Sequence, residues 1–218
     1  NHVVGGAVNS ADLSTGYINT SATFDGEADG PLSMYVNTSE GVMLNGISSV
    51  TTADVSADNG VIHIVDAVIT LPSVVTFAAA DAATFSELVG ALTRADQPDY
   101  VSVLTTANGT APAPFTVFAP TNQAFADLYA ELGVAGIDDV DGAILTATLN
   151  THVVAGANVR AEDLVTGTVA TLGDAVEIDA TTAIITDPNG RTSQVIVTNV
   201  QAANGVIHAI DTVLLPQL

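Results

Sequence analysis

The pattern of apolar and polar positions along the chain occurs twice. The segments from Asn59 to Pro72 and from Asn204 to Pro216 share one plan: an Asn-Gly pair, an almost continuous apolar and β-branched stretch, and a closing proline. Asn-Gly favours a tight hairpin turn, and proline ends a strand. A run that is apolar on both faces favours a central strand over an edge strand. We therefore predict strands at 61–71 and 206–215, each closing one unit of the same kind.

The hydrophobic period changes to that of a helix between these two strands. Phe85, Leu88, Val89 and Leu92 fall on one helical stripe, and Thr84 with Glu87 predicts a capping box at the start of that helix. Further helices are expected at 74–80, at 100–104, after Pro120-Thr121-Asn122 and at 144–149, with a loop at 107–114 and a strand at 115–119. Residues 73–151 thus form a helical half with one strand.

The rest of the chain predicts strands. His2-Val3-Val4 matches His152-Val153-Val154, and Thr15-Gly16 matches Thr166-Gly167 in the same order. Short strands are expected at 18–24, 33–37, 42–44 and 47–55, and again at 168–172, 176–180, 183–187 and 194–201, with a hairpin turn at 187–190. Residues 73–218 then form a complete second domain, and residues 1–72 form only the strand-rich C-terminal half of a first one. Apolar strands without their helical layer would leave a face in water, so either the missing half was removed or another segment or chain covers that face. Self-association through residues 1–72 is one such arrangement.

The charge balance is strongly acidic and restricts the partners. Among 218 residues, 24 are acidic and 3 are basic, for a net charge of −21, while 48% are hydrophobic. Nucleic acids and anionic membrane surfaces require clustered Lys and Arg, so both are excluded as partners. No apolar run is long enough to cross a bilayer, so no membrane insertion is expected within this sequence. The acidic residues are scattered and indicate a solvating surface. A marine or halophilic source is a hypothesis, because salt would screen the self-repulsion.

The residue inventory removes several kinds of chemistry. The chain has no Cys and no Lys, so disulfides, thiolate catalysis and Schiff-base mechanisms are impossible. Hydrolase, zinc-protease and phosphate-loop motifs do not occur. The Asp-rich segment 138–142 lacks the first and last ligands of a calcium loop, although weak surface binding of calcium stays open. Sequons at Asn19, Asn37 and Asn108 matter only in a host that glycosylates proteins.

Four histidines and two aspartates are the candidates for reactive groups. His63 and His208 lie inside the apolar strands, and two interpretations are open: a metal or proton-transfer site, or a buried neutral imidazole bonded to the backbone. The second is favoured, because a zinc site needs three or four converging ligands. His2 and His152 are interpreted in the same way, and proximity of His152 to His208 would still make a weak site. Asp66 and Asp211 are expected to accept backbone amides, and Asn122 is expected to cap a helix.

Three motifs together resemble the fasciclin-like domain. They are Phe115-Thr116-Val117-Phe118-Ala119-Pro120-Thr121-Asn122-Gln123-Ala124-Phe125, then His152-Val153-Val154, then Asn204-Gly205-Val206-Ile207-His208-Ala209-Ile210-Asp211. The resemblance covers residues 73–218, and residues 1–72 are similar to the second half of such a domain. It implies an α+β fold with a β-sandwich or wedge core and helices packed around it. The positions matching the family signatures, expected to be structural, are Phe118, Pro120, Thr121, Asn122, Phe125, His152, Asn204, Gly205, His208 and Asp211, with His2, Asn59, Gly60, His63 and Asp66 in the first copy.

The resemblance also implies a function. Members of this family are mostly extracellular, secreted or anchored at the cell surface, often in tandem, and act in adhesion without being enzymes. We expect a non-catalytic binding module without a cofactor, whose partner is a surface or matrix protein or a polysaccharide. In animal members a Tyr-His pair is linked to integrin-dependent adhesion, but Thr151 and Asn1 precede the two histidines here. A prokaryotic surface or exported protein fits this departure better. A structural spacer and a small-ligand carrier are the alternatives.

Overall fold

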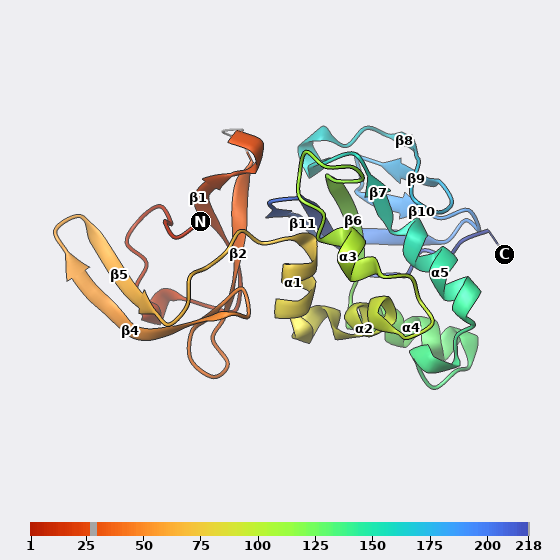
Figure 1. The fold of residues 1–218 in the computed structure, drawn as a ribbon. Helices are drawn as coiled ribbons and strands as arrows, with labels where there is room; N and C mark the ends of the chain where they lie inside the picture. The colour runs from red at the N-terminus through yellow and green to blue at the C-terminus, as the bar shows by residue number, and fades with distance from the viewer. Residues whose placement is uncertain (27–29, 218) are drawn as a thin grey trace.

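The computed structural model describes residues 1–26 and 30–217, which form two units side by side (Figure 1). The N-terminal unit, the described part of residues 1–72, is an antiparallel sheet in the order β1-β2-β3-β4-β5. Its strands are β1 (Gly16–Thr23), β2 (Pro31–Asn37), β3 (Met43–Leu44), β4 (Ser48–Ala57) and β5 (Gly60–Val65). Helical 3-10 turns lie at Ser10–Asp12 and Phe24–Gly26.

The C-terminal unit, residues 73–217, combines helices with a seven-stranded sheet in the order β7-β6-β12-β11-β10-β9-β8. Its helices are α1 (Val74–Ala80), α2 (Ala82–Thr93), α3 (Tyr100–Leu104), α4 (Asn122–Leu132) and α5 (Gly142–Thr151). Its strands are β6 (Phe115–Pro120), β7 (Val153–Ala155), β8 (Gly167–Val169), β9 (Val176–Asp179), β10 (Ile184–Thr186), β11 (Thr192–Ala202) and β12 (Gly205–Ile210). Short 3-10 turns occur at Ile137–Asp139 and Ala161–Asp163. The expected α+β class and the expected helices and strands are confirmed, apart from their boundaries.

β6 is the strand that joins the two cores of the C-terminal unit. It lies parallel to β12, with Phe115 opposite Gly205 and Pro120 opposite Ile210. Successive side chains of a strand point to opposite faces. Phe115 and Val117 therefore belong to the core under the helices, whereas Phe118 belongs to a second core formed with β9 to β12. β6 therefore packs against the helical layer with one face and against the remaining strands with the other.

The two units meet at β2. Its side chains Met34 and Val36 belong to the small core of the N-terminal unit, and Tyr35 belongs to the core of the C-terminal unit. The hydroxyl groups of Tyr17 and Tyr35 each donate to the buried Asp81 carboxylate, both at 3.1 Å. The outer face of β2 is thereby covered by α1 and its neighbours, as Figure 1 shows.

The joint between α1 and α2 differs from the prediction. Ser73 and Thr76 form the capping box, at the start of α1, and not Thr84 and Glu87. The amide of Asp81 closes α1 by donating to Phe77, and the same residue is the N-cap of α2. Thr84 therefore already lies inside α2. In the described residues no single helix has the length and apolar character to cross a bilayer; α1 and α2 meet that criterion only as a pair bent by 119°.

Two further expectations about strands were wrong. The closing strands end at Val65 and Ile210 and do not reach the prolines, because the chain turns away at the following aspartates. β5 is an edge strand in the described chain, not a central one. The segment after His2 forms no strand, whereas its counterpart forms β7 by pairing with β6. The described residues of the N-terminal unit include no strand in the position of β6, and the segment after His2 bonds to β1 instead, where the Val3 carbonyl accepts from the Ser21 amide at 2.7 Å.

Candidate binding surface

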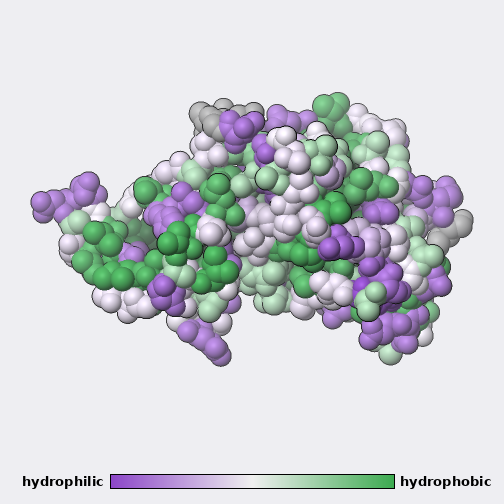
Figure 2. All heavy atoms as spheres, in the orientation of Figure 1, coloured by the Kyte–Doolittle hydropathy of each residue, from purple (hydrophilic) through white to green (hydrophobic). Residues whose placement is uncertain are grey.

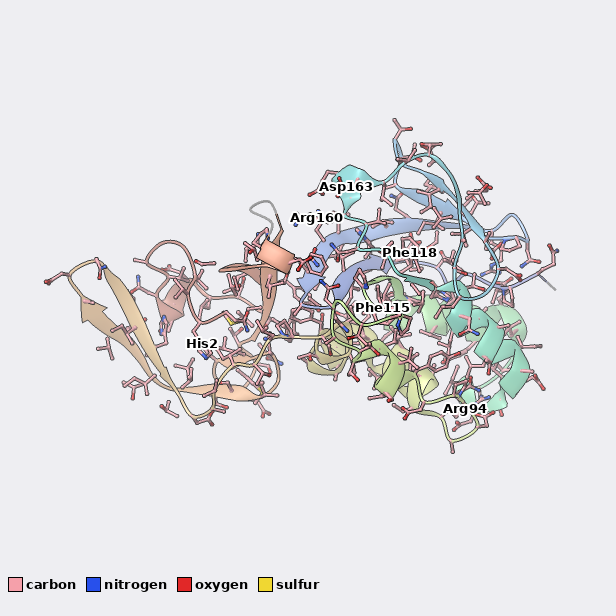
Figure 3. The ribbon with its side chains drawn as sticks, turned by 45° about the horizontal axis from the view of Figure 1, so that its top comes forward. His2, Arg94, Phe115, Phe118, Arg160 and Asp163 are labelled. Atoms are coloured by element: carbon pink, nitrogen blue, oxygen red, sulfur yellow. The ribbon has the colours of Figure 1, made fainter. Side chains whose placement is uncertain are left out.

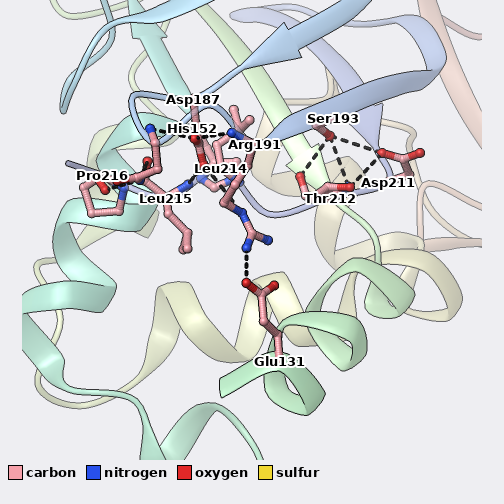
Figure 4. Close-up of polar contacts among 11 residues, drawn as sticks. Glu131, His152, Asp187, Arg191, Ser193, Asp211, Thr212, Leu214, Leu215 and Pro216 are labelled. Carbon is pink, nitrogen blue, oxygen red and sulfur yellow. Dashed lines mark hydrogen bonds and ion pairs between the residues drawn. The ribbon is translucent and has the colours of Figure 1, made fainter. Parts of the chain in front are cut away.

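Both ring nitrogens of His152 form hydrogen bonds with the backbone of the C-terminal unit, and Figure 4 shows the bond to Leu214. Its Nδ1–H donates to the Thr148 carbonyl at 2.8 Å, and its Nε2 accepts from the Leu214 amide at 3.0 Å. This pattern requires the neutral imidazole. Complete burial lowers the pKa of His152 to about 4, against weaker opposing effects of the Thr148 carbonyl and Asp187. His152 thus connects the end of α5 to the C-terminal segment.

His208 is buried at the centre of β12. Its Nε2–H donates to the Val159 carbonyl at 3.0 Å, and its ring centroid lies 6.0 Å from that of Phe118. Burial lowers the pKa of His208 as well. Phe118 also donates its amide to the His152 carbonyl. The two histidines are thus near a common neighbour, but each ring bonds to a different part of the backbone.

The N-terminal unit repeats one bond of each histidine, that of the His152 Nε2 and that of the His208 Nε2, at the matching positions. His2 Nε2 accepts from the Ile69 amide at 3.0 Å, and His63 Nε2–H donates to the Val8 carbonyl at 2.9 Å. Ile69 and Val8 occupy the places of Leu214 and Val159 in the repeat. Matching residues in the two copies therefore form the same two bonds between a histidine and the backbone. We call these bonds the histidine latches.

The aspartates after the closing strands are also used in the same way. Asp66 accepts from the Ser49 amide at 2.7 Å, and Asp211 accepts from the Gln194 amide at 2.8 Å. Each carboxylate ties the end of its strand to the start of the neighbouring one. An ionised carboxylate in this position acts as a hydrogen-bond acceptor that holds a turn.

The Asn-Gly pair behaves differently in the two copies. Asn204 accepts from the Val74 amide and donates to the carbonyls of Leu104 and Thr106, so it links β12 to the helices. A Cβ on Gly205 would lie 2.2 Å from the Phe115 carbonyl oxygen in β6. In the N-terminal unit Asn59 is exposed, and a Cβ on Gly60 would meet nothing within 4 Å.

The remaining signature residues hold β6 and α4 in place. Phe118, Pro120 and Phe125 are buried, and Thr121 caps α4 by accepting from Ala124. Asn122 was expected to cap that helix, which is wrong. Its side chain reaches α2 instead, where it accepts from Glu87 and donates to the carbonyls of Ala82 and Ala83. Sequence spacing carries no signal for such a contact between helices.

Charged groups form no converging cluster in the part of the chain that the structure describes. Residues 1–26 and 30–217 contain no group of three or more His, Asp or Glu side chains that could hold a metal ion. Each arginine is bound to an acidic residue: Arg94 to Asp96, Arg160 to Glu162, and Arg191 to Glu131 and Asp187. Arg94 in turn lowers the pKa of Asp96 to about 2.

The N-terminal unit carries an open apolar surface. We call Ile62, Ile64 and Val68 the open face; their side chains are 54%, 50% and 75% exposed. The counterparts Ile207, Ala209 and Val213 are 2%, 2% and 1% exposed, because the helices cover them. Figure 2 shows hydrophobic residues gathered around β4 and β5 at the left of the view.

A cavity of about 520 Å³ adjoins this surface, and its lining includes Ile62 of the open face. Its lining is mostly apolar and includes Met34, Val36 and Val65, together with His2 and His63. Figure 3 shows His2 within this unit and Phe118 inside the C-terminal one. The open face and the cavity together are the candidate binding surface.

Comparison with known families decides the relationship. The model of the fasciclin domain matches residues 1–72 and 83–216. The chain belongs to the fasciclin domain family. The resemblance seen in the three sequence motifs is therefore confirmed, and it extends over both units.

Relatives of this fasciclin chain occur in bacteria and fungi. A protein of Synechocystis sp. is 34% identical over 146 residues, covering 66% of this chain and 98% of its own length. The cell surface glycolipoprotein MPB83 of Mycobacterium bovis is 35% identical over 65% of this chain and 60% of its own. A fasciclin-like arabinogalactan protein of Arthroderma benhamiae is 32% identical over 79% of this chain, which is 37% of that protein.

A solved structure shares the fold. It is a FAS1 domain pair from the insect cell adhesion molecule fasciclin I, with a TM-score of 0.55 and 22% identity. The match covers 86% of this chain and 67% of that one. The fasciclin chain described here therefore spans about two thirds of a domain pair.

Two features of the structure were not predicted from the sequence. Asp81 and its two tyrosine donors lie far apart in the sequence and come together only in the fold. The open face was expected from the missing helices, but the cavity behind it was not. A search for β6-like segments in each copy of the repeat would have pointed to it.

Proposed function

We propose that this chain is a binding module of a cell-surface or secreted fasciclin protein, acting in adhesion and not in catalysis. The observation that carries the proposal is the fate of the signature side chains. The histidines, aspartates and Asn204, which could have formed a reactive site, are each bonded to the backbone of their own unit. Because these polar residues are occupied by bonds inside the fold, they are not available for a reaction. The function then depends on the groups exposed at the surface of the molecule.

The relatives support the location. MPB83 carries a cell-surface name at 35% identity, and the fungal relative is described as a fasciclin-like arabinogalactan protein. The structural neighbour comes from a cell adhesion molecule. We extend surface localisation and adhesion from these proteins to this chain as a proposal, with a surface protein or polysaccharide as the partner.

The test is retention of the intact chain on defined surfaces. Beads carrying the chain are mixed with cells, with immobilised polysaccharides and with matrix proteins, at low and at molar NaCl. Adhesion through the acidic surface predicts retention that weakens with salt, since the net charge of −21 would be screened. Adhesion through the open face predicts retention that persists in salt. Retention on none of these surfaces would contradict the proposal.

A small-ligand carrier is the second candidate, and the cavity of about 520 Å³ is the observation that favours it. Cavities of this size accommodate drug-sized apolar molecules. Apolar dyes and fatty acids are the probes, followed by calorimetry. Saturable binding that shifts the amide resonances of the cavity lining, such as those of Met34, Val36 and Val65, would favour a carrier over an adhesion module.

A further inference from the structure

The two copies of the repeat differ at one edge of the sheet, and this difference predicts what binds there. In the C-terminal unit, β12 has β11 on one side and β6 on the other. In the N-terminal unit, β5 has β4 on one side and an unpaired edge on the other. β4 and β5 reproduce the irregular register of β11 and β12, with shifts at matching residues. The unpaired edge is therefore the place that β6 occupies in the other copy.

The space beside Gly60 is the strongest indication that another backbone can pair with this edge. Its counterpart Gly205 has a backbone φ of +157° and lies so close to β6 that a Cβ would come within 2.2 Å of the Phe115 carbonyl oxygen and 2.8 Å of its amide nitrogen. At Gly60 the same side of the backbone faces open space. A glycine in a strand weakens it and often marks the close approach of another backbone. The described chain supplies no such backbone at Gly60.

Asn59 differs from its counterpart in its bonds to the helical layer. Its counterpart Asn204 is buried and satisfies one amide and two carbonyls of the α1 and α3 regions. Asn59 is exposed and borders the cavity. Its amide group is free to make the same three bonds to a similar segment.

The cavity matches a side chain of such a strand. Phe118 of β6 lies against His208 and packs in one core with Ile210. The counterparts of these two residues, His63 and Val65, line the cavity of the N-terminal unit. Ile62 and Ile64 of the open face alternate with His63 and Val65 along β5. A strand placed like β6 would fill the cavity from one face and bring its helices over the open face from the other.

We propose that the β5 edge and the adjoining cavity bind a helix-first fasciclin half, a polypeptide segment like residues 73–151 that lies outside residues 1–218. The segment adds a strand parallel to β5, with its equivalent of Phe115 opposite Gly60 and its equivalent of Phe118 in the cavity. Residues 73–151 themselves are not the occupant, because their own β6 is paired with β12 and β7. For the same reason, a second folded copy has no free β6 to offer.

The first experiment titrates the isotope-labelled 218-residue chain with a peptide of the β6 sequence, residues 114–122, and follows amide chemical shifts. We expect saturable shifts in Asn59 to Val65 and in the cavity lining at millimolar peptide. A control peptide with Asp at the position of Phe118 should cause none of them. The absence of shifts, or shifts elsewhere in the chain, would overturn the proposal.

Two variants test the position of the strand. Gly60→Val should abolish the shifts, because its side chain occupies the space of the incoming backbone. Ala57→Val should preserve them, since Ala57 pairs with Gly60 from the β4 side and leaves the open edge unchanged. Equal binding by the two variants would contradict docking at this edge.

A fused chain removes the limit of weak peptide affinity. A copy of residues 73–150 is placed ahead of Asn1, since Asn1 is the counterpart of Thr151 in the repeat. We expect slow amide exchange at Val61 to Val65 in the fusion and fast exchange in the fusion carrying Gly60→Val. Sedimentation of the unfused chain covers the remaining occupant: a dimer with protected β5 amides would show that a second copy binds instead, and would overturn the proposal.

Discussion

The N-terminal and C-terminal units of this fasciclin chain are built from the same sequence words but end in different environments. Both carry the histidine latches, the aspartate turn and the bulged strand pair. The C-terminal unit adds β6 and five helices, which bury its closing strand completely. In the N-terminal unit the closing strand alternates between partly buried and exposed residues. The difference between the units therefore distinguishes signature residues that bond within the strand half from those that bond to the helical half.

Latches that act within the strand half are present in both units, whereas the Asn-Gly pair acts only on the helical half. Asn204 and Gly205 have close neighbours in the helical half, and Asn59 and Gly60 do not. The same substitution in the two copies should therefore have unequal effects for the Asn-Gly pair. The size of this difference can be measured with matched substitutions in the two units.

Gly205→Val is expected to have the largest effect. The new side chain would overlap the backbone of β6 and would also strain a φ of +157°. We expect a loss of more than about 5 kcal/mol of unfolding free energy, which prevents folding of the C-terminal unit. Gly60→Val should change stability by no more than about 1 kcal/mol, since that side chain enters open space on a strand. Urea unfolding followed by circular dichroism measures both; equal losses would show that the two glycines have the same role.

Asn204→Ala should follow. It leaves the Val74 amide and two carbonyls without their buried partner, at a cost of about 4 kcal/mol. Asn59→Ala should cost under about 0.5 kcal/mol, because Asn59 is exposed. Thermal unfolding of the matched pair gives the difference. A costly Asn59→Ala would mean that the N-terminal unit already has a bound partner in solution.

The acid sensitivity of the chain should depend on His152. The folded state holds the pKa of His152 at about 4, below the ordinary value of 6.5, so the unfolded chain binds a proton that the folded one excludes. The unfolding free energy should therefore fall as the pH drops from 6.5 to about 4, by on the order of 3 kcal/mol from this group.

The measurement is the unfolding free energy across this range for the natural chain and for His152→Gln. The variant should lose this component of the pH dependence, while His2→Gln, which alters an exposed histidine, should retain it. Identical pH profiles for the natural chain and His152→Gln would contradict the buried neutral imidazole.

The contact between the units should give the smallest effect. Tyr35→Phe removes one of the two tyrosine bonds to Asp81 and should cost about 1 kcal/mol. Tyr17→Phe removes the other and serves as the matched variant. The double variant should lose more than the sum of the two, because the buried carboxylate then lacks both donors. Strict additivity would indicate that Asp81 does not couple the units.

The sequence predicted the repeat, the α+β class and nearly every element, because those depend on local period and turn chemistry. The Asn-Gly turns, the closing prolines and the helical stripe after Phe85 are signals carried by a few adjacent residues. The misplaced capping box shows the limit of this approach. Thr84 and Glu87 have the right spacing, but the turn at Asp81 starts α2 earlier.

The remaining errors involve contacts between distant segments. Asn122 has the composition of a cap, yet its partners lie 35 to 40 residues away in α2. The central-strand prediction for β5 followed from its apolar faces and was wrong only because β6 has no counterpart in the described N-terminal unit. Composition therefore indicated the environment for which this strand is suited, and the fold showed that the neighbour is not within the described part of residues 1–72.

The claim that β5 has an open edge, whereas β12 is paired on both sides, can be tested by amide hydrogen exchange. The measurement compares the two strands in the intact chain at single-residue resolution. β12 lies between two strands, so its amides should exchange only through global unfolding of the C-terminal unit. β5 has one open edge, and its amides pointing away from β4 should exchange at least about a hundredfold faster. Equally slow exchange along both strands would show that the β5 edge is already covered and would contradict an N-terminal unit with an open docking edge.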